Sequence, residues 1–188
     1  MNMADLVQQT ADTLLRGGTL LYPTDTIWGI GCDARRADAV EKLYALKERD
    51  RTKSMLVLCS PAQVEGNPWL SAEAERPTTY ILPAEIWQPL LGGLVAGNLA
   101  ADDGSLGIRV PRHDFCQSVI HRLGAPLVST SANLSGRPSP TTYNDIEDEL
   151  KRRVDLCVPP LPALLSAETR GSRILRVLPD GTTAVLRP

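Results

Sequence analysis

The sequence predicts an α/β fold, a single domain in which helices flank a mixed β-sheet. Short apolar runs alternate along the chain with segments of helical spacing, as in layered α/β domains. Several neighbouring strands have tight connections, which favours a mixed sheet over a wholly parallel one. The 188 residues contain no internal repeat and no flexible linker, so we expect one domain over residues 1–188.

Local patterns predict the individual elements. A helix is expected at residues 4–16, a second behind Asp38 as its N-cap, a third at 114–123 that Gly124 stops, and a fourth at 143–153. The Gly- and Pro-rich residues 83–104 carry no readable pattern. Strands are expected at residues 19–23, 27–32, 54–59, 78–82, 106–110, 126–130, 154–158, 173–178 and 184–186.

Composition excludes several classes of protein. With 43% hydrophobic and 22% charged residues, the chain is not disordered. The 20 basic and 22 acidic residues give a net charge of −2, which excludes nucleic-acid binding by bulk charge but leaves room for a local basic cleft. Its four cysteines form no C-x-x-C pair, so we expect reduced thiols and no zinc site. Without an 18-residue apolar run or a secretory signal, a cytoplasmic protein is expected.

The first candidate segment follows an apolar run and reads Tyr22-Pro-Thr-Asp-Thr26. Two hydroxyls and a carboxylate lie in one turn, and the glycines behind them let a ligand approach the backbone. The alternative is an ordinary turn in which Asp25 and Thr26 bond their own backbone.

The second candidate is residues 47–53, KERDRTK, with four cations in seven residues at the end of a helix. Arginine forks and lysine point charges suit a phosphate clamp. A solvated loop that complements the helix dipole is the alternative.

The third candidate is residues 129–142, STSANLSGRPSPTT, which follow a predicted strand. Such a dense cluster of hydroxyls and amides suits a polar small molecule or phosphate oxygens, and an ordinary Ser/Thr/Pro loop is the alternative. Walker A, G-x-G-x-x-G and G-x-S-x-G motifs are missing. Of the two histidines, His113 follows a strand in a loop that could line a site, and His121 lies within a predicted helix as a packing or surface residue. Residue patterns alone therefore predict an α/β protein with a cleft for an anion or a nucleotide, and no more specific function.

Taken together, these segments resemble the YrdC family, whose established members are threonylcarbamoyl-AMP synthases. The matching stretches are YPTDTIWGIGCDA, LYALKERDRTKSMLVL with a K-x-R motif, GIRVPRH, and PLVSTSANLSGRPSPTT with an S-x-N motif. The resemblance implies a twisted mixed sheet around a concave cavity. It also implies condensation of L-threonine, bicarbonate or carbon dioxide, and ATP with Mg²⁺ to threonylcarbamoyl-AMP and pyrophosphate. Partner proteins would then modify position 37 of tRNA.

The resemblance also implies roles for individual residues. Those expected to bind threonine are Thr26, Arg109, Ser131 and Ser172. Those expected to bind ATP are Lys47, Arg49, Lys53, Ser105, Asn133, Thr141 and Arg187. The catalytic set is Lys47, Arg49, Ser131 and Asn133, and no metal ligand is expected.

Some positions depart from the family pattern. Leu58 stands where several members have a histidine, and Ser172-Arg173-Ile174 replaces S-T-I. One alternative is a YciO-like protein that binds double-stranded RNA or tRNA without this synthesis. Another is the carbamoyl-adenylate domain of hydrogenase maturation, which usually belongs to a longer chain. The intact K-x-R and S-x-N motifs favour the synthase.

Overall fold

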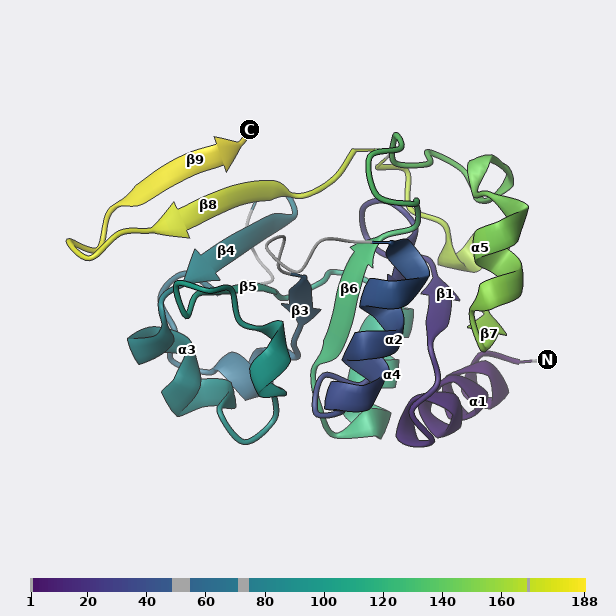
Figure 1. Cartoon of the computed structure of the whole chain (residues 1–188), viewed down its shortest axis with the longest axis horizontal. Coiled ribbons are helices and arrows are strands. Elements are labelled where there is room, and N and C mark those ends of the chain that lie inside the picture. Colours follow the sequence, from purple (N-terminus) through teal and green to yellow (C-terminus); the bar gives the residue numbers. More distant parts are fainter. Residues whose placement is uncertain (1, 49–54, 71–74, 169) are drawn as a thin grey trace.

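Nine strands in the described part of the chain, residues 2–48, 55–70, 75–168 and 170–188, form one sheet in this computed structural model (Figure 1). Their order across the sheet is β7-β1-β2-β6-β3-β5-β4-β8-β9. The strands are β1 (Leu20–Tyr22), β2 (Gly29–Gly31), β3 (Leu56–Leu58), β4 (Thr78–Leu82), β5 (Leu106–Arg109), β6 (Leu127–Ser131), β7 (Leu156–Cys157), β8 (Arg173–Val177) and β9 (Thr183–Arg187). Each predicted strand is present, with ends that match the prediction or differ from it by at most two residues.

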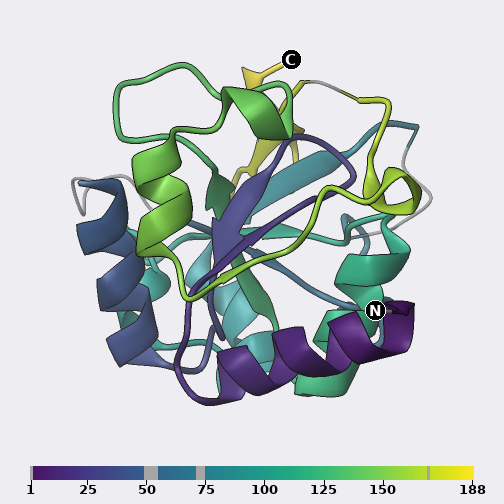
Figure 2. The same cartoon turned by 90° about the vertical axis from the view of Figure 1, so that its right-hand side faces the viewer.

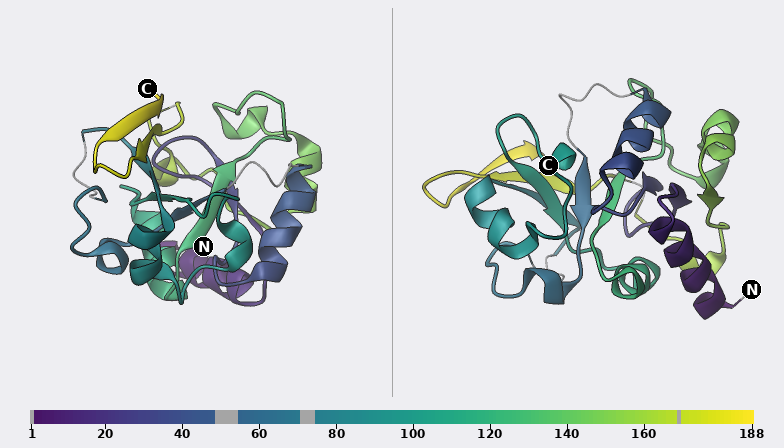
Figure 3. Two further views of the ribbon diagram at one scale, coloured as in Figure 1. Left: turned by 60° about the vertical axis from the view of Figure 1, so that its left-hand side comes forward. Right: turned by 60° about the horizontal axis from the view of Figure 1, so that its bottom comes forward.

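The sheet is mixed, as predicted. The pairs β1–β7, β3–β5 and β4–β8 are parallel, and the other five pairs are antiparallel. Strand β6 pairs with β2 on one side and with β3 on the other, so it joins the two halves of the sheet. Figures 1 and 3 place the β8–β9 hairpin at the opposite end of the molecule from the N-terminal helix.

The α-helices are α1 (Met3–Leu15), α2 (Ala37–Lys47), α3 (Ala84–Leu91), α4 (Asp114–Leu123) and α5 (Asp148–Arg153). Helices α1 and α4 confirm their predictions, and Gly124 ends α4 in the left-handed conformation with φ 70°. The predicted N-cap of α2 is wrong. Arg36 holds that position, and Asp38 lies in the first turn, where its carboxylate pairs with the Arg36 guanidinium at 2.8 Å.

The predicted helix at 143–153 is confirmed only for its second half, because the structure divides it. A 3₁₀ turn covers Tyr143–Asp145, Ile146 is extended, and α5 begins two residues later. The Asp145 carboxylate accepts hydrogen bonds from the backbone N–H and the hydroxyl of Thr142, which closes the first turn separately. Helix α3 lies in the stretch without a readable pattern and contains Pro89.

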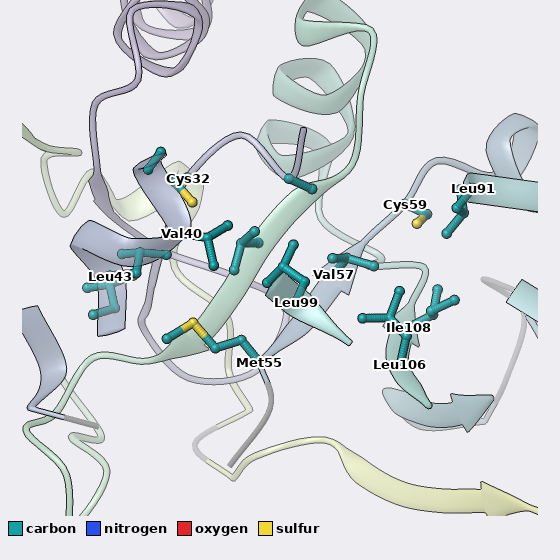
Figure 4. Close-up of a cluster of buried hydrophobic side chains, with 14 of the residues drawn as sticks. Cys32, Val40, Leu43, Met55, Val57, Cys59, Leu91, Leu99, Leu106 and Ile108 are labelled. Atoms are coloured by element: carbon teal, nitrogen blue, oxygen red, sulfur yellow. The ribbon is translucent and has the colours of Figure 1, made fainter. Parts of the chain in front are cut away.

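Two apolar clusters lie on opposite faces of the sheet. Because side chains alternate along a strand, Val57 and Val128 point to one cluster while Leu58 and Leu127 point to the other. The first cluster includes residues of α2 and α3 and is drawn in Figure 4. The second is covered by α1 and α4, and Figure 2 shows α2 and α4 on opposite sides of the sheet. No helix among the described residues is long and apolar enough to cross a membrane.

Candidate active site

A cavity of about 240 Å³ lies on the sheet face that α1 and α4 cover elsewhere. Its floor consists of alternate residues of the central strands. Their side chains point to the same face of the sheet as Leu58 and Leu127 of the second apolar cluster. The lining residues on strands are Gly29, Leu56, Thr79, Ile81, Gly107, Arg109, Ser129, Thr130, Ser131, Ile174 and Arg187. The rest of the lining comes from connecting segments: Thr24, Thr26, Ile27, Trp28, Met55, Ser139, Gly171 and Ser172.

Small residues keep this floor open. A Cβ atom at Gly107 would lie 3.2 Å from the Cβ of Leu56 and would project from the floor. A Cβ at Gly29 would lie 3.1 Å from the Ser129 hydroxyl. On the covered part of the same face, leucine and phenylalanine side chains occupy the equivalent space. Glycine and serine in the central strands therefore make the hollow that large residues would fill.

Arg109, at the end of β5, is the most deeply placed charge of the cavity. Its side chain is 3% exposed, and its Nη1 donates to the Thr26 hydroxyl at 3.0 Å. The same nitrogen lies 3.2 Å from Oδ1 of Asp25. Its Nε is buried and has no hydrogen-bond partner in the described part of the chain. Such a guanidinium suits a ligand carboxylate or phosphate.

The segment that carries Asp25 is tied to distant parts of the chain. Asp25 Oδ2 accepts the backbone N–H of Arg112, and the Asp25 carbonyl accepts the Ser166 hydroxyl. Together with the Arg109 contacts, these bonds reach residues more than eighty positions away. The interpretation of an ordinary turn is therefore wrong for the side chains of Asp25 and Thr26, although Thr26 N–H does bond the Thr24 hydroxyl locally.

A second cation lines the cavity from the C-terminal strand. Arg187 Nε donates to the Ser172 carbonyl at 2.8 Å, and its Nη2 lies 3.4 Å from the Ser172 hydroxyl. That hydroxyl also bonds the Thr79 hydroxyl at 2.7 Å. Desolvation, and then the nearby charge of Arg109, lower the pKa of Arg187. Two guanidinium groups thus face one hollow, which favours an anionic ligand.

Beside the cavity, Lys47 and the S-x-N motif come together. The Lys47 ammonium, at the end of α2, is buried and donates to the Ser131 carbonyl at 2.5 Å. The Asn133 amide donates to the carbonyls of Leu134 and Arg137, and its Oδ1 is buried without a partner among the described residues. The Lys47 contact ties the end of β6 to the end of α2, and the Asn133 bonds hold the loop after β6 together.

The structure does not bring every predicted residue to this cavity. The Ser105 hydroxyl is outside the lining and donates to Asp103 at 2.5 Å. Thr141 is exposed and bonds Asp145 at 3.0 Å. Arg49 and Lys53 lie outside the described residues, so the phosphate clamp stays a prediction.

Several other side chains have structural roles. His113 caps α4 by accepting the Cys116 N–H, and its other ring nitrogen bonds the Leu164 carbonyl at 2.9 Å. All four cysteines are free thiols, and burial raises the pKa of Cys116. No group of three or more His, Cys, Asp or Glu side chains that could hold a metal ion occurs among the described residues.

Sequence reasoning missed Thr79 as part of the cavity. It included Thr24 and Ser129 in its candidate segments but gave neither an individual role, and it gave Asp25 no role toward Arg109. A polar residue inside an otherwise apolar strand is the available signal for Thr79 and Ser129. The contact between Asp25 and Arg109 has no local signal, because it depends on the packing of β5 against the segment after β1.

The fold and the cavity define an α/β protein with a mixed sheet. A small cavity lined by two arginines lies on the part of the sheet that α1 and α4 leave uncovered. The family model Sua5_yciO_yrdC, described as telomere recombination, matches residues 12–188. The chain therefore belongs to the Sua5/YciO/YrdC family.

Curated relatives cover most of the chain. A threonylcarbamoyl-AMP synthase of Xanthomonas campestris pv. campestris is 34% identical over 155 residues, 76% of this chain and 79% of the relative. One of Photobacterium profundum is 30% identical over 181 residues, 89% of each chain. The chain is thus homologous to proteins named threonylcarbamoyl-AMP synthase over most of its length.

Solved structures share the fold. P. abyssi Sua5 complexed with L-threonine matches with a TM-score of 0.76 and 22% identity, over 100% of this chain and 55% of that one. The chain therefore spans little more than half of that Sua5 chain. E. coli YciO matches with a TM-score of 0.71 and 22% identity, over 99% of this chain and 89% of that chain.

Proposed function

We propose that this chain is an ATP-dependent threonylcarbamoyl-AMP synthase, a nucleotidyltransferase. The observation that carries the proposal is the buried guanidinium of Arg109, bonded to Thr26 inside a small cavity. Curated relatives at 30–34% identity carry the name of this activity, and the P. abyssi structure holds L-threonine. The homology and the charge of the cavity support the same chemistry.

L-threonine occupies the cavity in this proposal. At about 240 Å³ the cavity is smaller than the roughly 300–1,000 Å³ of sites for drug-sized ligands, which suits an amino acid. The threonine carboxylate binds Arg109, and Thr26, Ser131 and Ser172 supply polar contacts around it. We assign the nucleotide to Asn133 and Arg187 and its phosphates to Lys47. Arg49 and Lys53 keep the phosphate-binding role that the family resemblance implies.

Two steps follow from this arrangement. The neutral amino group of threonine attacks bicarbonate, and loss of water leaves a carbamate. A carbamate oxygen then attacks the α-phosphorus of ATP, and pyrophosphate leaves. Negative charge grows on the phosphoryl oxygens, where fixed guanidinium and ammonium groups stabilise it. The protein acts by positioning and charge stabilisation, without a covalent intermediate.

ATP enters as its Mg²⁺ complex in this proposal, with the metal carried by phosphate oxygens as is usual for nucleotide sites. The product would pass to partner proteins that transfer the threonylcarbamoyl group to adenosine 37 of tRNA. We place these steps in the cytoplasm, where tRNA, ATP and bicarbonate are all available.

Pyrophosphate release by the purified chain tests this function. We expect release that requires ATP, L-threonine and bicarbonate together, and that stops when any one of them is omitted. L-Serine and L-valine serve as matched amino acid controls. Absence of threonine-dependent release, with tight binding of double-stranded RNA in a parallel titration, would favour the alternative of an RNA-binding protein.

A further inference from the structure

Two threonine hydroxyls in the cavity wall form a short chain of hydrogen bonds. Thr24 Oγ1 donates to the Ile27 carbonyl at 2.8 Å and accepts the Thr26 N–H at 3.0 Å. The hydroxyls of Thr24 and Thr26 lie 3.0 Å apart. Thr26 Oγ1 also accepts Arg109 Nη1 at 3.0 Å. Both hydroxyls are buried and both residues line the cavity.

A count of protons and lone pairs fixes the direction of this chain. A hydroxyl has one proton and two lone pairs, whereas a carbonyl can only accept. Because the Thr24 proton goes to the Ile27 carbonyl, Thr24 must accept from Thr26 in the bond between the two hydroxyls. The Thr26 proton is therefore used, and one of its lone pairs is used by Arg109.

We infer that Thr26 offers the ligand only a lone pair, so that it recognises the substrate's amino group as a donor, and that Thr24 is the positioning residue that sets this polarity. This inference rests on the proposed function and deepens it. Thr26 and Arg109 are bonded to each other, so a donor group and a carboxylate bound to them must be neighbours in the ligand. An α-amino acid has these two groups on one carbon.

The polarity matters for the reaction. When Thr26 accepts an N–H of the neutral amine, the nitrogen lone pair stays free to attack bicarbonate. If the hydroxyl donated instead, it would bond that lone pair and make the amine a poorer nucleophile. Thr24, which does not need to touch the substrate, thereby acts on the rate through the orientation of the Thr26 proton.

Two analogues of L-threonine test the inference by calorimetric titration of the full chain. One replaces the amino group by a hydroxyl, which can donate a hydrogen bond, and the other by a keto oxygen, which can only accept. We expect the hydroxyl analogue to bind about tenfold more tightly, because the keto oxygen would face the Thr26 lone pair.

Substitutions at Thr24 provide the second readout. In Thr24→Val the Thr26 proton loses its acceptor and can turn to the ligand, so the preference for the hydroxyl analogue should shrink to about twofold or reverse. The matched control Thr24→Ser keeps the hydroxyl and should keep the tenfold preference. If Thr24 had only a structural role, its substitution would weaken the binding of both analogues by the same factor.

Each outcome decides a separate claim. Wild-type preference for the keto analogue, or a preference unchanged in Thr24→Val, overturns the inference even if threonine-dependent pyrophosphate release is present. Preference for the hydroxyl analogue without any such release supports the inference and overturns the synthase. If Thr24→Val does not fold, the wild-type comparison alone decides the polarity of Thr26.

Discussion

Asp25 and Arg109 form a buried ion pair, in which Arg109 lines the cavity. Asp25 Oδ1 lies 3.2 Å from Arg109 Nη1, and the two side chains are 7% and 3% exposed. The pair joins the segment after β1 to the end of β5, so the long-range packing of the sheet builds the anion site. It also means that a substrate carboxylate must share Arg109 with a protein carboxylate.

Asp25→Asn should destabilise the free protein and make its stability depend more on L-threonine. Removing one partner of a buried pair leaves an uncompensated charge, so we expect the free energy of unfolding to fall by about 2–4 kcal/mol. Saturating L-threonine should restore more stability to the variant than it adds to the wild type, because the substrate carboxylate replaces the lost counter-ion of Arg109. Urea denaturation with and without L-threonine measures both effects.

Asp148→Asn is the matched control for this substitution. Asp148 pairs with Lys151 at 3.1 Å but is 79% exposed. We expect a loss of at most about 1 kcal/mol and no change in the effect of threonine. Equal stability of the two variants would contradict the role given to the buried pair.

Arg109→Lys should weaken the binding of L-threonine without weakening the binding of ATP. A lysine point charge cannot serve Asp25, Thr26 and a substrate carboxylate in the geometry of a guanidinium fork. We expect the KM for L-threonine to rise at least about tenfold while the KM for ATP changes less than about twofold. Arg112→Lys is the control, since Arg112 is exposed and reaches Asp25 only through its backbone N–H. Equal increases in both KM values would argue against a threonine site at Arg109.

Asn133→Ala should loosen the segment after β6. The Asn133 amide bonds two carbonyls of its own loop, those of Leu134 and Arg137. We expect a stability loss of about 1–3 kcal/mol and faster proteolytic cleavage between residues 134 and 139. Asn98→Ala is a matched control, because the Asn98 amide also makes two bonds, to Ala37 and Glu41, away from the cavity. Asn98→Ala should lower the stability by a similar amount without exposing the loop after β6. Equal cleavage in both variants would show that the Asn133 bonds do not hold this loop.

Acid should weaken the contact that joins strand β8 to the loop preceding β5. Asp103 accepts the Ser105 hydroxyl, Arg176 Nη1 at 2.8 Å and the Ser105 N–H, and these donors hold the pKa of Asp103 well below its usual range. A lowered pKa stabilises the fold above the unfolded value of about 3.9, and the contribution disappears as the pH falls through the folded value. We therefore expect a shallower loss of stability below pH ~4 in Asp103→Asn than in the wild type. Identical acid profiles would contradict this assignment.

Ser105→Ala distinguishes two roles for the same hydroxyl. Since it bonds Asp103 outside the cavity, we expect a stability loss of about 1 kcal/mol and an unchanged KM for ATP. A raised KM for ATP would instead support the nucleotide contact that the family resemblance implies.

Local signals explain which parts of the fold could be predicted. Helix α4 has apolar residues at helical spacing and a glycine directly after it, so both its face and its end are encoded nearby. Helix α3 lacks such signals, because Pro89 and two following glycines obscure a short helix held by packing around Trp87. The division before α5 depends on one side chain, Asp145, which closes its own turn.

The site shows the same limit. Thr26, Arg109, Ser131, Ser172 and Arg187 could be proposed from their motifs and do line one cavity. Their partners could not be proposed, because Asp25 and Thr79 acquire roles only when distant strands meet. Thr24 differs again, since its importance follows from the number of protons in a hydrogen-bond chain and not from any pattern of residues.

Mass spectrometry of the product made from ¹³C-bicarbonate tests the central claim most directly. The purified chain is incubated with ATP, Mg²⁺, L-threonine and the labelled bicarbonate, and the nucleotide products are analysed. We predict an AMP adduct that contains one threonine and one labelled carbon, formed together with pyrophosphate. Release of pyrophosphate without the labelled adduct, or no reaction in the presence of all substrates, would contradict the account.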